Sequence, residues 1–206
     1  MERWDEVDHF IEDHLVPQDD ALRTAAGGIG VSAPQGKLLH LLARSIGARR
    51  ILELGTLHGY SAIWLARALP ADGELITLEL DPDTAATARA NVDRAGVGER
   101  VDIRVGPALE SLPGVDGPFD LAFLDADKAG MPDYFAAVVP LVRTGGLIIG
   151  DNTVRAGAVI DGEDPSAVGA RRFHEVVASS PDVEATGLQT VGTKGHDGFV
   201  LALKVT

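Results

Sequence analysis

The chain has 206 residues, 45% of them hydrophobic, which is enough for one well-buried domain. A formal net charge of −13 and the lack of any Lys/Arg-rich run argue against a nucleic-acid-binding surface, which needs a basic patch. The chain has no cysteine, no apolar run long enough to span a bilayer and no signal-peptide pattern in its charged first residues. We therefore expect a cytoplasmic protein with neither a membrane nor a nucleic-acid partner.

The expected elements begin with two helices, around residues 4–16 and 34–46, joined by the Gly-rich segment AAGGIGVSA. Apolar β-rich runs then alternate with segments of helical period, which is typical of an α/β fold. The predicted strands cover residues 49–55, 73–80, 100–106, 119–125 and 145–151. The helices between them are expected within residues 61–69, 82–96, 108–112 and 131–142. Asp81 and Pro82 form an N-cap followed by a first-turn proline for the second of these helices.

A further helix, at 165–180, and two strands, at 183–191 and 197–205, follow the fifth strand. The pattern predicts a single-domain, Rossmann-like, doubly wound sheet that is mostly parallel and carries a C-terminal antiparallel hairpin at its edge. We divide it into N-terminal helices with a candidate lid (1–47), a cofactor-binding core (48–152), and a C-terminal helix with edge strands (153–206).

Acidic residues end four of the five predicted strands: Glu53, Glu79, Asp125 and Asp151. For each acid alone, a solvated strand end or a helix cap is the favoured interpretation. The carboxyl ends of parallel strands meet at one edge, where such sheets bind ligands near the reversal of strand order. The placement of all four acids at this edge therefore favours a ligand-binding site there.

The turn ELGTLHGYS after the first strand decides between nucleotide ligands. A dinucleotide fingerprint starting at Gly55 would need glycines where Leu57 and Tyr60 stand, which disfavours a dehydrogenase. Glu53 would repel a pyrophosphate but attract a cationic ligand, and S-adenosylmethionine carries a sulfonium and an ammonium. Glu79 follows Gly55 by 24 positions, close to the ~20 at which an acid binds ribose hydroxyls in nucleotide-binding α/β folds.

Oxygen ligands for a metal are predicted to meet after the fourth and fifth strands. Asp125, Asp151 and Asn152 supply two carboxylates and a carbonyl without any His or Cys, which favours a hard ion such as Mg²⁺, with Mn²⁺ or Ca²⁺ as alternatives. Lys128 would reach the same place from the start of the next helix. In the alternative interpretation, Asp125, Asp127 and Lys128 only cap that helix and pair with one another.

With these motifs in view, the chain resembles the metal-dependent, S-adenosylmethionine-using O-methyltransferases of the catechol and caffeoyl-CoA type, which have the class I methyltransferase fold. The resemblance runs from about Val31 to Lys204. It is carried, in the family's order, by GVSAPQGKLLHLL, ILELGTLHGYSAIWLA, ITLELDPDTAATARANVDRAG, VGPALESLP, FLDADK, GGLIIGDN and DGFVLALK.

The resemblance implies a role for each predicted site residue. The implied metal ligands are Asp125, Asp151 and Asn152, and the implied general base is Lys128. The implied cofactor contacts are Val31, Gly55 and Ser61 at the methionine portion, Glu79 at the ribose, Ala108 near the adenine and Asp125, and we add Glu53 for its attraction to a cation.

The implied reaction moves the methyl group of S-adenosylmethionine to a hydroxyl of a catechol-like vicinal diol on a small phenolic or polyhydroxylated acceptor. A homodimer is also expected. Three alternatives stay open: methylation of a non-phenolic hydroxyl on a macrolide or sugar, a nicotinamide-dependent dehydrogenase, and a non-catalytic scaffold. The scaffold would be expected to have lost at least one metal ligand or the lysine, but all four residues are present.

Two positions depart from the family pattern. Met131 and Arg155 stand where the family often has aromatic residues, although Tyr134 keeps the second aromatic of the first motif. We expect Met131 to pack. Arg155 could bind an acidic acceptor, but a solvated loop arginine is the favoured interpretation. We expect His58 to be a turn residue and both His174 and His196 to be structural or surface groups. Trp4 and Trp64 are expected to fill the core or an interface.

Overall fold

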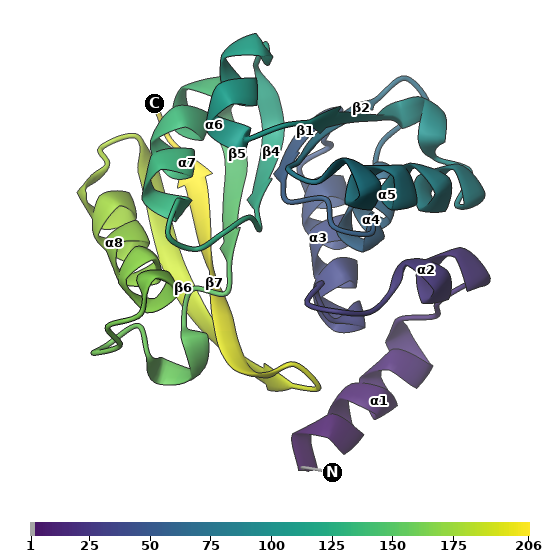
Figure 1. Cartoon of the computed structure of the whole chain (residues 1–206), viewed down its shortest axis with the longest axis horizontal. Coiled ribbons are helices and arrows are strands. Elements are labelled where there is room, and N and C mark those ends of the chain that lie inside the picture. Colours follow the sequence, from purple (N-terminus) through teal and green to yellow (C-terminus); the bar gives the residue numbers. More distant parts are fainter. Residues whose placement is uncertain (1–2) are drawn as a thin grey trace.

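A seven-stranded sheet runs through the middle of the molecule in the order β3-β2-β1-β4-β5-β7-β6 (Figure 1). The computed structural model describes residues 3–206. The strands are β1 (Arg50–Leu54), β2 (Glu74–Glu79), β3 (Val101–Val105), β4 (Phe119–Leu124), β5 (Val142–Asp151), β6 (Val183–Gly192) and β7 (Gly195–Lys204). Strands β1 to β5 pair in parallel, whereas β7 runs antiparallel to both β5 and β6. The predicted fold is confirmed, and its strand order reverses between β1 and β4.

Eight α-helices accompany these strands in the described part of the chain. They are α1 (Arg3–Leu15), α2 (Asp20–Ala25), α3 (Ala33–Ser45), α4 (Tyr60–Ala66), α5 (Pro82–Arg94), α6 (Ala108–Ser111), α7 (Met131–Val138) and α8 (Pro165–Ser179). Short 3₁₀ turns cover Gly98–Arg100, Leu112–Gly114, Val139–Leu141 and Arg155–Gly157. The predicted cap of α5 is confirmed, because the Asp81 carboxylate accepts a hydrogen bond from Thr84 N at 2.7 Å.

Two elements differ from the prediction. The short helix α2 was not expected; the Asp19 side chain caps it, and Leu22 is buried in the core. The helix predicted over 131–142 ends at Val138, and Val142 already begins β5, three residues before the predicted strand. Pro140 explains the early end, because proline lacks the N–H that a continuing helix needs.

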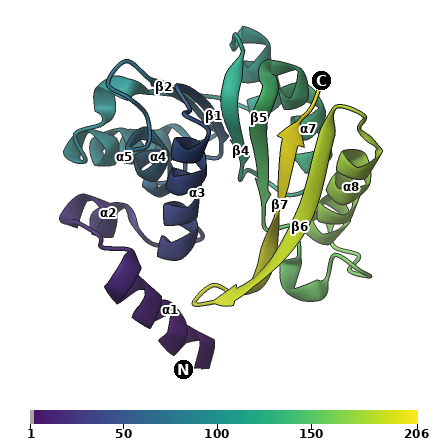
Figure 2. The ribbon, with the colours of Figure 1, turned by 180° about the vertical axis from the view of Figure 1, so that it is seen from behind.

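The strand residues alternate between two apolar layers, as period-2 geometry requires. Ile51, Leu121 and Phe123 point to the face covered by α2, α3, α4 and α5, while Leu52 and Leu124 point to the face covered by α6, α7 and α8. The view from behind shows the same two-sided cover (Figure 2). Such burial on both faces explains why these strands read as nearly continuous apolar runs.

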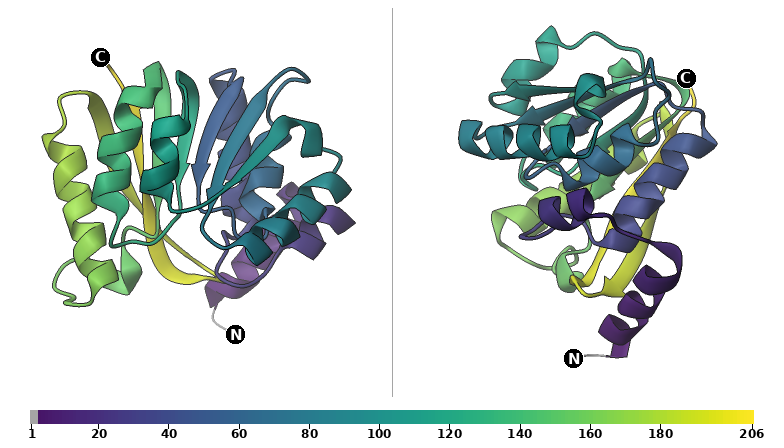
Figure 3. Two further views of the ribbon diagram at one scale, coloured as in Figure 1. Left: turned by 45° about the horizontal axis from the view of Figure 1, so that its top comes forward. Right: turned by 90° about the vertical axis from the view of Figure 1, so that its right-hand side faces the viewer.

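The N-terminal helix α1 stands apart from the two layers, at the end of the molecule where the tip of the β6–β7 hairpin lies (Figure 3). It contributes no buried residue, and its apolar side chains Trp4, Val7 and Phe10 are exposed. Among the described helices, none has the length and apolar character to cross a membrane. The cytoplasmic location stays a prediction.

Candidate active site

A cavity of about 1090 Å³ opens beyond the carboxyl ends of the parallel strands. Its lining includes residues that follow β1, β2, β3, β4 and β5, which is the position expected for a ligand in a doubly wound sheet. The remaining walls come from residues between Ala25 and Leu38 and from the tip of the β6–β7 hairpin. Nine of the ten predicted site residues line it: Val31, Gly55, Ser61, Glu79, Ala108, Asp125, Lys128, Asp151 and Asn152.

The turn after β1 lies against the loop after β4, at the reversal of strand order. Gly55 has a φ of +95°, and a Cβ there would lie 2.3 Å from the Asp125 carbonyl oxygen. Only glycine meets both demands, because a side chain would be strained in this conformation and would collide with the neighbouring backbone. The close contact brings the predicted cofactor turn next to the predicted metal carboxylate.

Glu53 is the predicted site residue that does not line the cavity. Its side chain is 0% exposed and lies beneath the cavity, between strand neighbours. Oε2 accepts a hydrogen bond from Thr77 Oγ1 at 2.6 Å, and Oε1 has no hydrogen-bond partner. Burial raises the pKa of this carboxyl to about 7, with smaller contributions from Asp125 and Glu79 and with Ser61 and Thr77 opposing.

Glu79 ties the ends of β1 and β2 together at the cavity wall. Its Oε2 accepts from Leu57 N at 2.8 Å and its Oε1 from Asp81 N at 3.1 Å. Leu57 itself has a left-handed φ of 47°, which a leucine rarely adopts, so the carboxylate holds an unfavourable turn in place.

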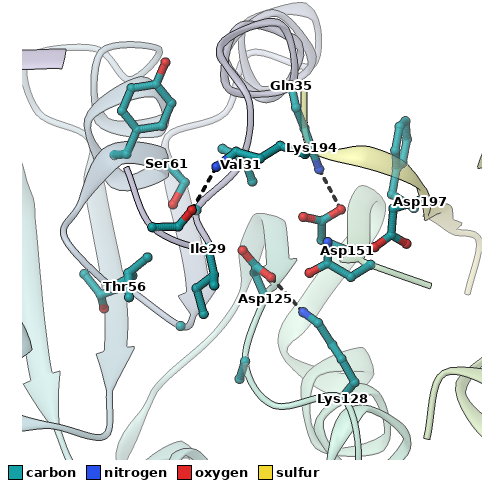
Figure 4. A pocket seen from close by; sticks show the side chains of 18 of the residues that line it. Ile29, Val31, Gln35, Thr56, Ser61, Asp125, Lys128, Asp151, Lys194 and Asp197 are labelled. Atoms are coloured by element: carbon teal, nitrogen blue, oxygen red, sulfur yellow. Dashed lines mark hydrogen bonds and ion pairs between the residues drawn. The ribbon is translucent and has the colours of Figure 1, made fainter. Parts of the chain in front are cut away.

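The DADK segment after β4 combines both of the interpretations weighed from the sequence. Asp127 caps the approach to α7 by accepting from Gly130 N at 2.8 Å, and the Tyr134 hydroxyl also donates to it. Lys128 Nζ donates to Asp125 Oδ1 at 2.7 Å, and both side chains line the cavity (Figure 4). Lys128 therefore pairs with Asp125, and Asp127 caps the approach to α7, but the Lys128–Asp125 pair still faces the cavity. Burial raises the pKa of Asp125, and the Lys128 charge partly opposes this.

Asp151, at the end of β5, faces the same space (Figure 4). Its Oδ1 accepts from Gln35 Nε2 at 2.6 Å. Burial raises the pKa of Asp151 to about 7, and the nearby Asp125 charge contributes, while Lys128 and Gln35 oppose the shift. Asn152 follows in a left-handed conformation, with φ 53°, and also lines the cavity.

This donor set fits a hard divalent cation. The Asp125 charge raises the pKa of Asp151, and two carboxylates that face one cavity favour a positive charge between them, while the neighbouring amide adds a third oxygen. No three His, Cys, Asp or Glu side chains come together as a metal-binding group in the described chain, so the fit depends on Asp125, Asp151 and the Asn152 carbonyl.

Among the other conspicuous residues, Met131 and Trp64 are placed as expected, whereas Trp4 and Arg155 are not. Met131 is buried against the Phe173 side of α8, and Trp64 is buried in the core. Trp4 is instead 42% exposed. Arg155 lines the cavity with a left-handed φ of 56°, and its backbone N donates to the Asp197 carboxylate. The histidines occupy a turn, a helix and the hairpin: His58, His174 and His196.

The N-terminal segment and the C-terminal hairpin meet over the cavity. Lys194 Nζ donates to the Gly28 carbonyl at 2.9 Å, and Thr193 N donates to Asp8 Oδ2 at 2.9 Å. Figure 4 shows the Lys194 side chain reaching across the pocket toward the segment that carries Ile29 and Val31. Sequence reasoning did not identify these contacts or Gln35.

Residues 6–205 match the O-methyltransferase family. The chain is 48% identical to a catechol O-methyltransferase of Niastella koreensis, with 97% of each chain covered. It is 47% identical to a catechol O-methyltransferase of Mycobacterium tuberculosis, with 96% of this chain and 94% of the relative covered.

Solved structures agree with the fold. The O-methyltransferase TomG of Streptomyces achromogenes, involved in tomaymycin synthesis and solved in complex with SAM, superposes with a TM-score of 0.96. It is 49% identical, with 99% of this chain and 98% of TomG covered. An O-methyltransferase of Bacillus cereus solved with SAH gives a TM-score of 0.94 at 46% identity, with 98% of each chain covered.

Proposed function

Because the chain belongs to the O-methyltransferase family and is an S-adenosylmethionine-dependent methyltransferase, we propose that it methylates one hydroxyl of a catechol-like vicinal diol with the help of a divalent cation. The observation that carries this proposal is a pair of carboxylates, the buried Asp151 and the half-buried Asp125, which share one cavity with Asn152 and Lys128. The names of the 47–48% identical relatives support a catechol-like acceptor.

Asp125, Asp151 and Asn152 would hold Mg²⁺ or a similar ion. Such an ion, when bound, makes a hydroxyl easier to deprotonate and fixes the position of a chelating diol. A neutral phenol is a poor nucleophile and must lose a proton near neutral pH, so a proton acceptor is also needed. Lys128 Nζ fills that role in our proposal, because its side chain is buried and faces the cavity beside Asp125.

The methyl donor would lie along the carboxyl ends of β1 and β2. Gly55, Val31 and Ser61 would contact its methionine portion, and Glu79 would accept hydrogen bonds from its ribose. All four residues line the cavity. Glu53, beneath the floor, supplies negative charge to its cationic groups. Ala108, on the same wall, lies near the adenine in this arrangement. Transfer from a sulfonium to a phenolate cancels charge, so the chain contributes mainly by holding the atoms at reacting distance, which can supply ~7–11 kcal/mol.

The test is a methyl-transfer assay on catechols and caffeoyl esters, with Mg²⁺ and with a chelator. We expect turnover that is lost on chelation and restored by added Mg²⁺ or Mn²⁺. Turnover that the chelator leaves unchanged would exclude a role for the metal. Absence of turnover on every vicinal diol tested would exclude a catechol-like acceptor.

The 49% identity to an enzyme involved in tomaymycin synthesis is consistent with a natural-product acceptor other than a simple catechol. Methylation of a non-phenolic hydroxyl, as on a macrolide or sugar, is our alternative proposal. The same assay with a panel of such hydroxyls separates the two, because a vicinal phenolic diol is required only by the first.

We also propose that residues 1–47 form a cover over the acceptor site and that two chains associate through α1. The contacts of Asp8 with Thr193 and of Lys194 with Gly28 close the cover, and the exposed Trp4, Val7 and Phe10 supply an apolar surface for a second copy. Light scattering on a sizing column tests the dimer. A monomeric wild type, or a dimer that persists after Phe10→Ser, would contradict an interface on α1.

A further inference from the structure

The two carboxylates that face the cavity each accept a hydrogen bond from one side-chain donor, but the two donors differ in charge. Asp125 Oδ1 accepts from the Lys128 ammonium at 2.7 Å, and Asp151 Oδ1 accepts from the Gln35 amide at 2.6 Å. Both bonds are drawn in Figure 4, where Gln35 descends from α3 toward Asp151. An ammonium is repelled by a divalent cation, whereas a neutral amide can stay beside one. Of the two donors, Gln35 is therefore the one that a cation bound between the carboxylates does not repel.

Gln35 reaches Asp151 from helix α3, which is capped at its first turn and packed closely against α4. Ser32 caps α3, and its hydroxyl accepts from Gln35 N at 3.4 Å. Gly36 then allows α3 to approach α4 closely, since a Cβ at Gly36 would lie 2.4 Å from Trp64 Cδ1. The amide is therefore presented by a rigid element that comes from 116 positions earlier in the chain.

This bond has two physical effects on Asp151. It gives one carboxylate oxygen a partner, which a buried anion needs because an unpaired one carries a large desolvation cost. It also restricts rotation of the carboxylate, so that its other oxygen is the one offered to a cation. Donors that orient metal ligands in this way typically contribute 10–100-fold to metal affinity or activity.

We propose that Gln35 is a positioning residue for Asp151, and that its neutral amide sets the orientation in which this carboxylate binds the divalent cation. The proposal rests on the metal site of the proposed function. Its matched substitutions are Gln35→Met, which keeps the length of the side chain and removes the donor, and Gln35→Asn, which keeps the amide and shortens its reach. The control is Gln189→Met, an exposed glutamine on β6 whose side-chain oxygen is hydrogen-bonded to His196.

Binding of Mn²⁺ to the full chain, followed by the loss of the free-ion signal in electron paramagnetic resonance, measures the effect without turnover. We expect the Kd for Mn²⁺ to rise at least 10-fold in Gln35→Met and Gln35→Asn and to change less than twofold in Gln189→Met. In turnover assays the Mg²⁺ concentration for half-maximal rate should rise in parallel, while the KM for S-adenosylmethionine stays within threefold. A purely structural defect would alter the KM and the melting temperature together.

The outcomes separate the two proposals. A wild type that binds no Mn²⁺ overturns both the metal site and the role of Gln35. A wild type that binds Mn²⁺, together with a folded Gln35→Met or Gln35→Asn that binds it within twofold of the wild type, overturns only the role of Gln35. If one substituted chain fails to fold, the other decides.

Discussion

The burial of Glu53 makes a quantitative prediction for the Glu53→Gln substitution. The difference between a pKa of about 7 in the folded protein and the ordinary 4.5 corresponds to ~3 kcal/mol of folding free energy. This loss of folding free energy is absent at low pH, where the Glu53 carboxyl is protonated in both the folded and the unfolded state. As the pH rises from 4.5 to about 7, the unfolded chain releases the proton first, so the wild type loses stability over this window.

The assay is urea unfolding of the cofactor-free and metal-free protein at several pH values between 5 and 8. Glutamine cannot titrate, so the stability of Glu53→Gln relative to the wild type should increase by up to ~3 kcal/mol between the two ends. The comparison uses the change with pH in the stability difference between the two proteins rather than the difference at any one pH. The new amide also changes the hydrogen bonding to Thr77, and this offsets the stability at every pH. Asp125 and Asp151 titrate in both proteins, and their contributions cancel to first order.

Curves for the two proteins that run parallel from pH 5 to pH 8 would refute the reasoning, since they would show that Glu53 ionises as easily inside as outside the fold. A second measurement connects the same carboxyl to its ligand. Affinity of the wild type for S-adenosylmethionine should rise with pH through about 7, because an ionised Glu53 attracts the cationic cofactor, and Glu53→Gln should lose this rise.

Three further predictions concern other parts of the site. Gly55→Ala should destabilise the protein by about 2–4 kcal/mol in urea unfolding and weaken cofactor binding, whereas Gly47→Ala, with φ +63° and open space around it, should cost only about 1–2 kcal/mol; equal costs would contradict the packing argument. Lys128→Met should lower kcat by ~10²–10⁴ while the cofactor affinity measured by calorimetry changes little, and an undiminished kcat would exclude the general base. Asp8→Ala should speed proteolysis near Gly27 relative to Asp13→Ala on the same helix; identical digestion rates would argue against the cover.

The fold was predictable because its signals are local. Each β-strand from β1 to β4 lies within one residue of its predicted bounds. A strand that is buried on both faces of the sheet appears in the sequence as an apolar run between turn residues, so its bounds are easy to recognise. The cap formed by Asp81 was visible for the same reason. Helix α2 was missed because six residues carry too little periodicity, and it is stabilised mainly by burying Ala21, Leu22 and Ala25 in the core.

The part of the candidate site that lies at the ends of strands could be predicted from the sequence. Asp125 and Asp151 end neighbouring parallel strands, so topology alone brings them together. Gln35 and Lys194 could not be predicted, because their partners lie 116 and 166 positions away and no periodic pattern links them. The burial of Glu53 could be predicted from its place between Leu52 and Leu54. That its side chain would not line the cavity could not be predicted.

Strand β7 follows β6 in the chain but lies inside it in the sheet, and this order constrains how the protein folds during synthesis. Because β7 lies between β5 and β6, β6 cannot join the sheet until β7 has left the ribosome. The edge of β5 is exposed until then, and an unpaired edge can recruit a strand from another nascent chain. We expect the growing polypeptide to form the parallel strands β1 to β5 before β7 is available to pair with β5. Chaperones that cover unpaired strand edges should matter most at that stage.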